Sequence, residues 1–363
     1  MTSNVLSEPF ATPIDSSRYP ELARRRKVTN DKWIALGVAA ELVWPKLQHA
    51  DRDTLHISDR ACIYVTGSVA RGEAASVSDL DLFIIDHLPT SVDGDQIHDA
   101  LNAIEKARLI SALDELRISC NFRPFSRGGE FIRVHSFQQM LEEIGAPSDD
   151  FSNSFTARLL LLMNSRPLLN VEAYNLARNE VLTSYWDRAN PEDHFLPIML
   201  TNDIRRWWGV LCLNFEHLNR RLKEQGYAST PKRRLDNLKL RYSKLLGVYS
   251  TLLDLVDRSG ADGLNRADAL EVFTSLPIDR IFSVSSRHAD DPDIPNLAHQ
   301  VLEGYDQYLA FVAKPEDELL TSLSNEESWT AQQNAAFKFH ETFVQLFAAT
   351  GRTSSPLYEY CIV

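Results

Sequence analysis

The first half of the chain alternates between amphipathic stretches and short apolar runs. Residues 18–49 predict an amphipathic helix because apolar side chains recur at helical spacing. The members of this stripe are Trp33, Leu36, Val38, Leu42 and Trp44. Residues 62–66 are β-branched and apolar and end before a glycine, which is typical of a buried strand. Residues 79–86 begin with acidic and apolar residues in alternation and become continuously apolar, so we expect a second strand there.

The segment between residues 93 and 135 predicts one further helix and two further strands. A helical pattern opens at Asp93 and runs to about Arg117. Residues 118–124 and 130–135 have strand character, and a turn with two glycines separates them. A mixed α/β domain is therefore expected over this part of the chain.

Beyond His135 the pattern becomes helical almost without interruption, and breaks coincide with glycine and proline. The helices are expected at 136–144, 151–165, 170–187, 194–225, 233–258, 264–275, 294–313 and 327–350. We therefore predict an α+β protein with three parts. These are an N-terminal helical segment (1–50), a mixed α/β domain (51–150) and an all-helical domain (151–363).

The composition and charge of the chain exclude some classes of protein. The 363 residues are 44% hydrophobic and 24% charged, as in globular proteins, and no apolar stretch approaches the roughly 20 residues that span a bilayer. The net charge of -12 disfavours nucleic acid and anionic lipid as partners. Four widely spaced cysteines indicate neither a disulfide framework nor a zinc site, and no signal-peptide pattern opens the chain, so we expect a cytoplasmic protein.

Candidate chemistry lies between the first two predicted strands. Gly67 and Ser68 end a strand where a helix can begin, so backbone N–H groups and the Ser68 hydroxyl are expected to face an anion. Asp79 and Asp81 are two residues apart on a strand, so both carboxylates leave the same face and can share Mg²⁺ or Mn²⁺. Paired carboxylates beside a phosphate cradle suit metal-dependent nucleotidyl transfer.

These residues resemble the DNA polymerase β-like nucleotidyltransferase superfamily, because Gly67-Ser68 is followed by a ten-residue spacer and Asp79-x-Asp81. The fuller string, Gly-Ser-x-Ala-Arg-Gly-Glu-x-x-x-x-Ser-Asp-x-Asp-Leu, looks most like the branch of the PII uridylyltransferases and glutamine-synthetase adenylyltransferases. Arg123-Pro124 with the following Arg127-Gly128-Gly129 is similar to a segment of the adenylyltransferases. Residues 202–209 and 237–244 look like the helical part of small stand-alone members.

The resemblance implies a polymerase-β-like catalytic domain over 51–150 and a helical domain over 151–363 that closes the nucleotide cleft. It implies ATP or UTP as substrate, release of pyrophosphate, and an acceptor hydroxyl on a protein. In the adenylyltransferases a third metal-binding aspartate precedes the Arg-Pro pair, and Ser119 stands at the equivalent position here. Asn121 and Glu130 are the other candidates to replace it. The departure motivates an alternative, a catalytically weak or inactive NTP-binding regulator, for example in a stress or defence module.

Basic residues supply the remaining candidates. Residues 203–244 contain 11 Lys and Arg against four acidic residues, within an acidic chain. By resemblance to members whose helical domain contacts the triphosphate, Arg205, Lys239 and Lys244 are candidate nucleotide-binding residues; a solvated basic face is the alternative. Arg71 either contacts phosphate or pairs with Glu73. Trp207 and Trp208 cannot both face inward, so one is a candidate base-stacking surface and core packing is the alternative.

Overall fold

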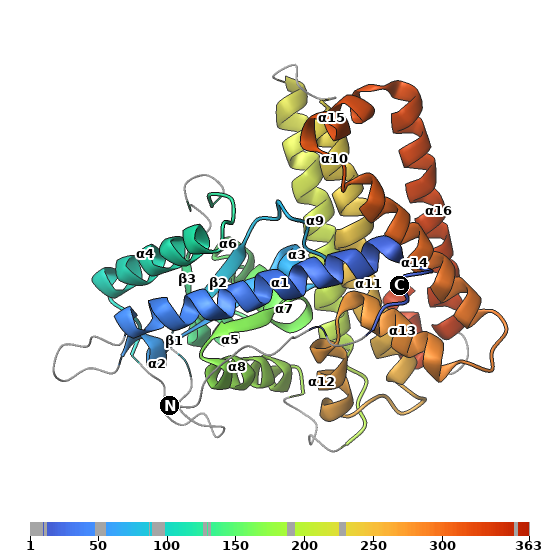
Figure 1. Ribbon diagram of the computed structural model, residues 1–363. Helices are drawn as coiled ribbons and strands as arrows, with labels where there is room; N and C mark the ends of the chain where they lie inside the picture. The colour runs from blue at the N-terminus through green and yellow to red at the C-terminus, as the bar shows by residue number, and fades with distance from the viewer. Residues whose placement is uncertain are drawn as a thin grey trace. The chain divides into compact units, whose positions relative to one another are not determined.

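A computed structural model describes most of the chain as two compact units (Figure 1). The first unit consists of Met1–Pro13 and Arg24–Ser184, and the second of Ile14–Ala23 and Tyr185–Val363. The described residues are 10, 13–47, 56–86, 88, 99–125, 129, 132–186, 193–224, 230–351 and 355–362.

The first unit is built on a four-stranded mixed sheet with the strand order β3-β2-β1-β4. The strands are β1 (Ala61–Thr66), β2 (Asp81–Asp86), β3 (Val134–Ser136) and β4 (Arg166–Leu169). β1 is antiparallel to both β2 and β4, whereas β3 runs parallel to β2. The pairing of Thr66 with Asp81 places the end of β1 beside the start of β2. The strands predicted at 62–66 and 79–86 are confirmed, with the second beginning at Asp81.

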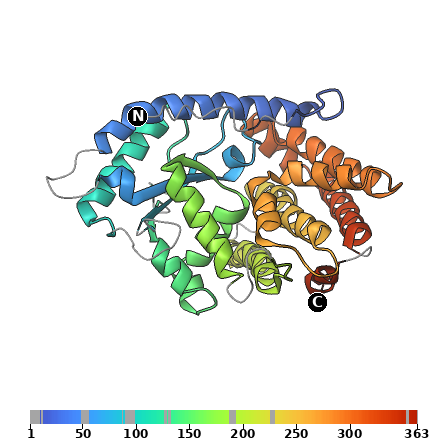
Figure 2. The ribbon, with the colours of Figure 1, turned by 90° about the horizontal axis from the view of Figure 1, so that it is seen from below.

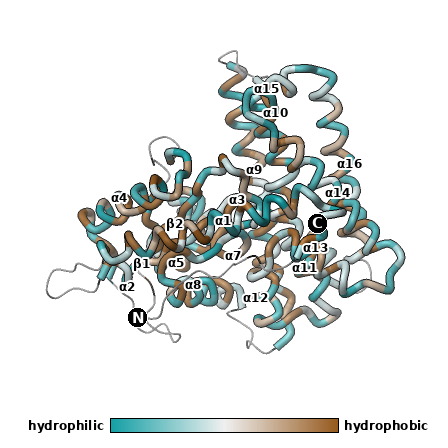
Figure 3. The backbone as a smooth tube through the Cα atoms, viewed as in Figure 1, coloured by the Kyte–Doolittle hydropathy of each residue, from teal (hydrophilic) through white to brown (hydrophobic). Residues whose placement is uncertain are grey.

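Helices cover both faces of this sheet. They are α1 (Pro20–Val43), η1 (Trp44–Leu47), α2 (Ile57–Arg60), α3 (Gly67–Ala70), α4 (Ala103–Ser119), α5 (Phe137–Glu142), α6 (Ser148–Phe151), α7 (Ser154–Met163) and α8 (Val171–Ser184). Ile63 and Ile84 face a buried cluster that contains Trp33 of α1 and Leu113 of α4. On the other face, the Tyr64 hydroxyl donates to the carbonyl oxygen of Ala157 in α7 at 3.0 Å. Figure 2 shows α1 along one side of the sheet and the green helices along the other, and the brown strands of Figure 3 mark the apolar core.

The strand predicted at 118–124 is wrong. α4 continues to Ser119, and the chain then turns at Asn121, whose φ of +55° lies in the left-handed region. The amide of Asn121 donates to Ile118 and that of Phe122 to Arg117, which is the hydrogen-bond pattern of a Schellman helix end. The β-like run at 118–122 is therefore the last turn of a helix and its cap.

The region after His135 also differs in part from the prediction. β4 interrupts the helices and pairs with β1 through Ile63 and Leu169. Its four residues contain Pro167, which disfavours a strand in the sequence but is tolerated at the edge of a sheet. The helices α13, α15 and α17 of the second unit were not predicted either.

The second unit is helical, and its longest elements are α9 and α16. Its elements are α9 (Ile198–Glu224), α10 (Pro231–Lys239), η3 (Leu240–Lys244), α11 (Leu245–Arg258), α12 (Arg266–Thr274), α13 (Pro277–Arg287), α14 (Ile294–Phe311), α15 (Glu316–Ser324), α16 (Glu326–Gly351) and α17 (Pro356–Ile362). η3 is a single π-helical turn that joins α10 directly to α11. The α+β fold class, with a small mixed sheet and a helical region, is thereby confirmed.

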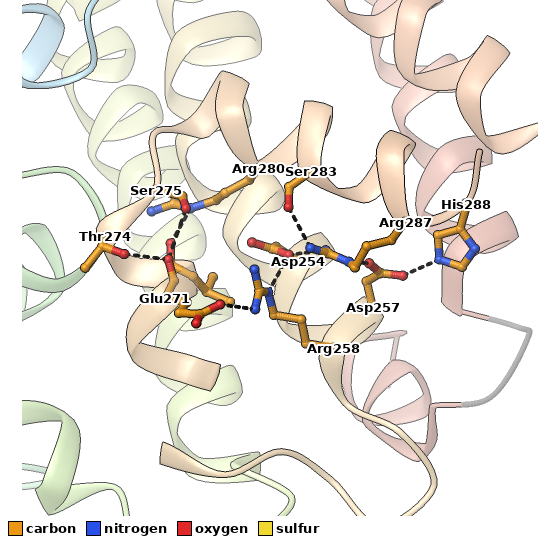
Figure 4. Close-up of polar contacts among 11 residues, drawn as sticks. Asp254, Asp257, Arg258, Glu271, Thr274, Ser275, Arg280, Ser283, Arg287 and His288 are labelled. Atoms are coloured by element: carbon orange, nitrogen blue, oxygen red, sulfur yellow. Dashed lines mark hydrogen bonds and ion pairs between the residues drawn. The ribbon is translucent and has the colours of Figure 1, made fainter. Parts of the chain in front are cut away.

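A buried ion-pair network joins α11 to α13 (Figure 4). Asp254 is fully buried and accepts from Arg258 at 3.1 Å and from Arg287. Arg287 also donates to Asp257 at 2.6 Å, and the other oxygen of that carboxylate lies 2.5 Å from Nε2 of His288. The pairing compensates the buried charge of Asp254, which would otherwise destabilise the unit.

None of the helices in the described ranges is long and apolar enough to cross a membrane.

Candidate active site

The two predicted carboxylates line one cavity in the first unit. Asp81 is the first residue of β2, and Asp79 precedes it by two positions. Both are exposed and both border a cavity of 510 Å³, called here the carboxylate cavity. This volume lies in the range of roughly 300–1,000 Å³ that is usual for small-molecule sites. The structure therefore brings together the carboxylates that the spacing predicted to share a face.

Gly67 lies directly against Asp81. Its φ of +70° is in the left-handed region, which favours glycine. A Cβ added at this position would lie 2.2 Å from Oδ2 and 3.2 Å from Cγ of Asp81. Any other residue would push the carboxylate aside, so glycine keeps the space beside Asp81 open.

The loop that carries Asp79 is fixed at several points. The Ser68 hydroxyl donates to Oγ of Ser78 at 3.1 Å, and the same Oγ accepts from the amide of Ala75 at 2.8 Å. The amide of Ala74 donates to the hydroxyl of Thr29 in α1 at 2.8 Å. Ser78, the residue before Asp79, is thus hydrogen-bonded to Ser68, the residue after Gly67.

Arg71 lies in the same loop and pairs with Glu73. Its Nε donates to Oε2 of Glu73 at 2.9 Å, and both side chains are buried. The Arg25 guanidinium donates to the carbonyl oxygen of Glu73 at 3.1 Å and fastens the loop to α1. This geometry is that of the ion-pair alternative, and a phosphate contact by Arg71 stays a prediction.

Basic and aromatic side chains form the rest of the carboxylate cavity. Arg123 and Arg133 border it, so two guanidinium groups and two carboxylates share one space. Val134 of β3 pairs with Ile84 of β2, and the two strands are parallel. Arg133, the residue before Val134, therefore lies beside Phe83, the residue before Ile84. Side chains alternate along strands, so Arg133, Phe83 and Asp81 leave the same face. Carboxylates suit a hard divalent cation and guanidinium groups suit phosphate, and the cavity offers both kinds of group.

His135 completes that face. Its ring stacks on Phe83 with centroids 5.8 Å apart and planes at 25°, and Phe83 stacks in turn on Tyr64. Burial lowers the pKa of His135, the charge of Arg133 lowers it further, and Asp86 acts in the opposite direction. Near neutral pH the cavity therefore presents an uncharged imidazole beside a charged guanidinium.

The residues proposed to replace a third carboxylate do not reach the cavity in the way predicted. Ser119 is the last residue of α4, and its hydroxyl donates to the carbonyl of Leu116 at 2.8 Å. Asn121 forms the left-handed helix cap, so these two residues do not share a strand face. Glu130 lies outside the described residues. Within the described ranges, no three His, Cys, Asp or Glu side chains gather as a metal site would require.

The predicted basic residues of the helical region belong to the second unit. The Arg205 guanidinium donates to the carbonyl oxygen of Tyr360 at 2.8 Å, which ties α9 to α17. Lys239 and Lys244 are exposed and flank the π-helical turn, one before it and one at its end. Contact of these three residues with a nucleotide stays a prediction.

Sequence reasoning did not single out Phe83, Arg133 or His135 as site residues. The signal that could have found them is the alternation of the segment Glu130–His135, once that strand is paired with the one that carries Asp81. The partner strand and the direction of a short strand depend on residues far away in the chain, so local sequence patterns do not reveal them.

Comparison with known proteins adds one positive finding. Residues 52–126 match the family model described as a nucleotidyltransferase domain, and the matched segment contains Gly67, Ser68, Asp79 and Asp81. The predicted superfamily is thereby confirmed for this segment. No curated protein matches the chain. The likeness to the uridylyltransferase and adenylyltransferase branch remains a prediction.

Proposed function

We propose that this chain, which carries a nucleotidyltransferase domain of the polymerase β-like superfamily over residues 52–126, transfers a nucleoside monophosphate from an NTP to an acceptor hydroxyl. The acceptor oxygen forms a bond to the α-phosphorus and loses its proton, and the bond from that phosphorus to the bridging oxygen breaks. Pyrophosphate is the leaving group. The observation that carries the proposal is that Asp79 and Asp81 border one cavity and that Gly67 lies against the Asp81 carboxylate.

The donor set fits a divalent cation of the Mg²⁺ type. Asp79 and Asp81 supply exposed carboxylate oxygens, and the missing side chain of Gly67 leaves room beside Oδ2 of Asp81. Asp79 makes no hydrogen bond or ion pair with any residue that the structure describes, so its oxygens are available. A bound Mg²⁺ or Mn²⁺ would neutralise charge on the phosphates and on the leaving pyrophosphate.

The remaining groups of the cavity act on the nucleotide. Arg123 and Arg133 are placed to hold phosphate oxygens, and Ser68 and the backbone after Gly67 are candidates for the same task. Phe83 and the neutral His135 offer a flat surface next to these charges. Arg205, Lys239 and Lys244 are proposed to contact the triphosphate from the helical domain.

The acceptor is proposed to be a side-chain hydroxyl of a partner protein, for example a tyrosine. This follows from the likeness to the PII uridylyltransferase and adenylyltransferase branch. The 510 Å³ of the carboxylate cavity suit a single nucleotide, so the acceptor is proposed to approach from outside it. ATP and UTP are the candidate donors.

Transfer of label tests the proposal. The purified chain is incubated with each α-labelled NTP and Mg²⁺ or Mn²⁺, with and without cell lysate, beside the double variant Asp79→Asn, Asp81→Asn. Asp99→Asn, an exposed carboxylate of the same unit outside the cavity, is the matched control. We expect label on a macromolecule with the wild type and with the control. Equal labelling by the double variant would overturn the proposal.

A second candidate function is nucleotide binding without transfer. It is favoured by the absence of a third acidic ligand beside Asp79 and Asp81 among the described residues. Two carboxylates bind a cation less tightly than three do. A protein that binds the NTP but holds the cation too weakly for transfer would act as an NTP-binding regulator. NTP binding with no label transfer under any of these conditions would support it over the first.

A further inference from the structure

A second cavity lies within the helical unit and shares no residue with the carboxylate cavity. It measures 310 Å³ and is enclosed by α9, α10, η3, α11 and α16, all of which belong to one unit. We call it the aromatic pocket, because Trp208, Phe215 and Phe337 are among the side chains that line it. Its volume is at the lower end of the range for small-molecule sites.

The walls of the aromatic pocket suit a flat ring. Trp208 comes from α9 and is fixed in an edge-to-face contact with Tyr249, with centroids 5.8 Å apart and planes at 79°. Phe337 comes from α16, and 55% of its surface is exposed. Exposure of a large apolar ring to water is unfavourable, and a ligand that stacks on the ring would bury it. Trp207, the neighbour of Trp208, is instead buried in the core.

Two polar groups in the pocket lack partners. Oδ1 of Asn237 is buried, yet it accepts no hydrogen bond from any residue in the described ranges. A buried polar atom left in this state is destabilising, and a turn of the amide that brings this oxygen to a ligand's donor would restore the hydrogen bond. The Arg241 guanidinium lies over the Phe337 ring at 4.7 Å and makes no ion pair with the described part of the chain. A stacked, unpaired guanidinium is preorganised to bind an anion.

The local backbone also marks this place. Leu240 and Arg241 line the pocket from η3, the single π-helical turn between α10 and α11. A π-helical turn is less stable than an α-helical one and is found frequently at functional sites. Asn237 stands one turn before it, so the same distortion sets the relative position of the amide and the guanidinium.

We propose that the aromatic pocket binds an adenine nucleoside monophosphate. The ring packs on Trp208 beside the Phe337–Arg241 pair, the Asn237 amide accepts from the exocyclic amine and donates to the neighbouring ring nitrogen, and Arg241 holds the phosphate. An asparagine amide pairs in this two-bond manner with adenine, whereas the corresponding edge of guanine offers two acceptors. One guanidinium matches one phosphate group. This site goes beyond the proposed transfer reaction and does not depend on it.

Equilibrium binding of AMP to the full chain in the presence of a metal chelator tests the proposal. The chelator and the double variant Asp79→Asn, Asp81→Asn separate this site from the carboxylate cavity, so that failure of one proposal does not imply failure of the other. We expect one saturable site in both proteins. Asn237→Leu should weaken AMP binding about 10-fold or more. Arg241→Met should reduce the affinity for AMP to that for adenosine and leave adenosine binding unchanged.

Matched controls are Asn214→Leu and Arg220→Met, two exposed α9 positions outside the pocket, which should bind AMP as the wild type does. A further measurement needs no variant. Cys212 lines the pocket, and burial raises the pKa of its thiol, so it is alkylated at alkaline pH and AMP should slow that reaction. Cys120 of the first unit is the internal reference.

Three results would overturn the proposal. The first is no saturable binding of AMP or adenosine. The second is wild-type affinity in folded Asn237→Leu and Arg241→Met proteins, with folding checked by thermal unfolding. The third is equal protection of Cys212 and Cys120 from alkylation by added AMP. Equal affinity for AMP and GMP would also overturn it.

Discussion

The carboxylate cavity and the aromatic pocket are assembled in opposite ways. The first gathers around a tight turn and the start of one strand, so Gly67, Asp79 and Asp81 are close in sequence as well as in space. The second is lined by residues of several helices, from Trp208 to His340 along the chain. A short sequence motif therefore indicates the first site, whereas for the second only the adjacent Trp207 and Trp208 give a local indication.

The two units differ also in how they hold buried charge. In the first, Arg158 and Asp149 form a fully buried ion pair at 2.6 Å, and Arg158 also donates to the carbonyl oxygen of Met140. In the second, Asp254 belongs to a network that involves two arginines. If the units are separate folding bodies, damage to one charge cluster should remain in its own unit.

The largest expected effect concerns these clusters. Arg158→Met leaves the charge of Asp149 uncompensated and should lower the free energy of unfolding of the first unit by about 3–5 kcal/mol. Asp254→Leu leaves Arg258 paired with Glu271 and Arg287 paired with Asp257, so it should lower that of the second unit by less. Denaturant titration combined with hydrogen exchange of peptides from each unit measures this. Arg18→Met, which breaks an exposed pair with Glu303, is the control and should cost less than about 1 kcal/mol. Equal loss of protection in both units would show that they unfold together.

The next largest effect is expected from a substitution that should impair the carboxylate cavity and leave the aromatic pocket unchanged. Gly67→Ala should lower the transfer rate about 100-fold, because the added Cβ displaces the Asp81 carboxylate from its position. AMP binding by the aromatic pocket should not change. Gly145→Ala is a matched control, since Gly145 also has a positive φ, +78°, but has no atom within 4 Å of the added carbon. Full activity of folded Gly67→Ala would contradict the close approach to Asp81.

The smallest effect is on the pH dependence of stability. The folded-state pKa of His135 is lowered, so between its folded and unfolded values the unfolded chain binds the proton and the folded chain does not. Stability should therefore fall as pH decreases below about 6.5, the unfolded value for histidine. His135→Gln should show a shallower fall in thermal unfolding temperature from neutral pH to mild acid.

His217→Gln, at an exposed position of the second unit, is the control. An unchanged slope in His135→Gln would show that the proton uptake of unfolding lies elsewhere. His299, whose pKa is also lowered by burial and by Arg18, is the next group to examine.

The sequence predicted those parts of the structure that depend on local spacing. β1, β2, the turn at Gly67 and the helical character beyond His135 follow from short-range patterns and are found. The residues 118–122 were misread because their β-like composition hides a helix end. The signal was present, since an asparagine after an amphipathic helix is a common left-handed cap.

The rest depends on pairing between distant segments. β3 joins β2 in parallel, and only that pairing places Arg133 and His135 in the carboxylate cavity. β4 reaches β1 from a hundred residues further along the chain and has a proline in its middle. The aromatic pocket likewise needs α9 and α16 to face one another, which no local spacing reveals.

The most direct test of the account is the rate of pyrophosphate release. It would be measured in a single turnover with Mg²⁺, the preferred NTP and the acceptor fraction, for the wild type, Asp79→Asn, Asp81→Asn and the control Asp99→Asn. The account predicts release by the wild type and the control, and a loss of about 1,000-fold in each of the other two variants. Release at the wild-type rate by Asp79→Asn or Asp81→Asn would contradict the assignment of these carboxylates as the centre of the reaction.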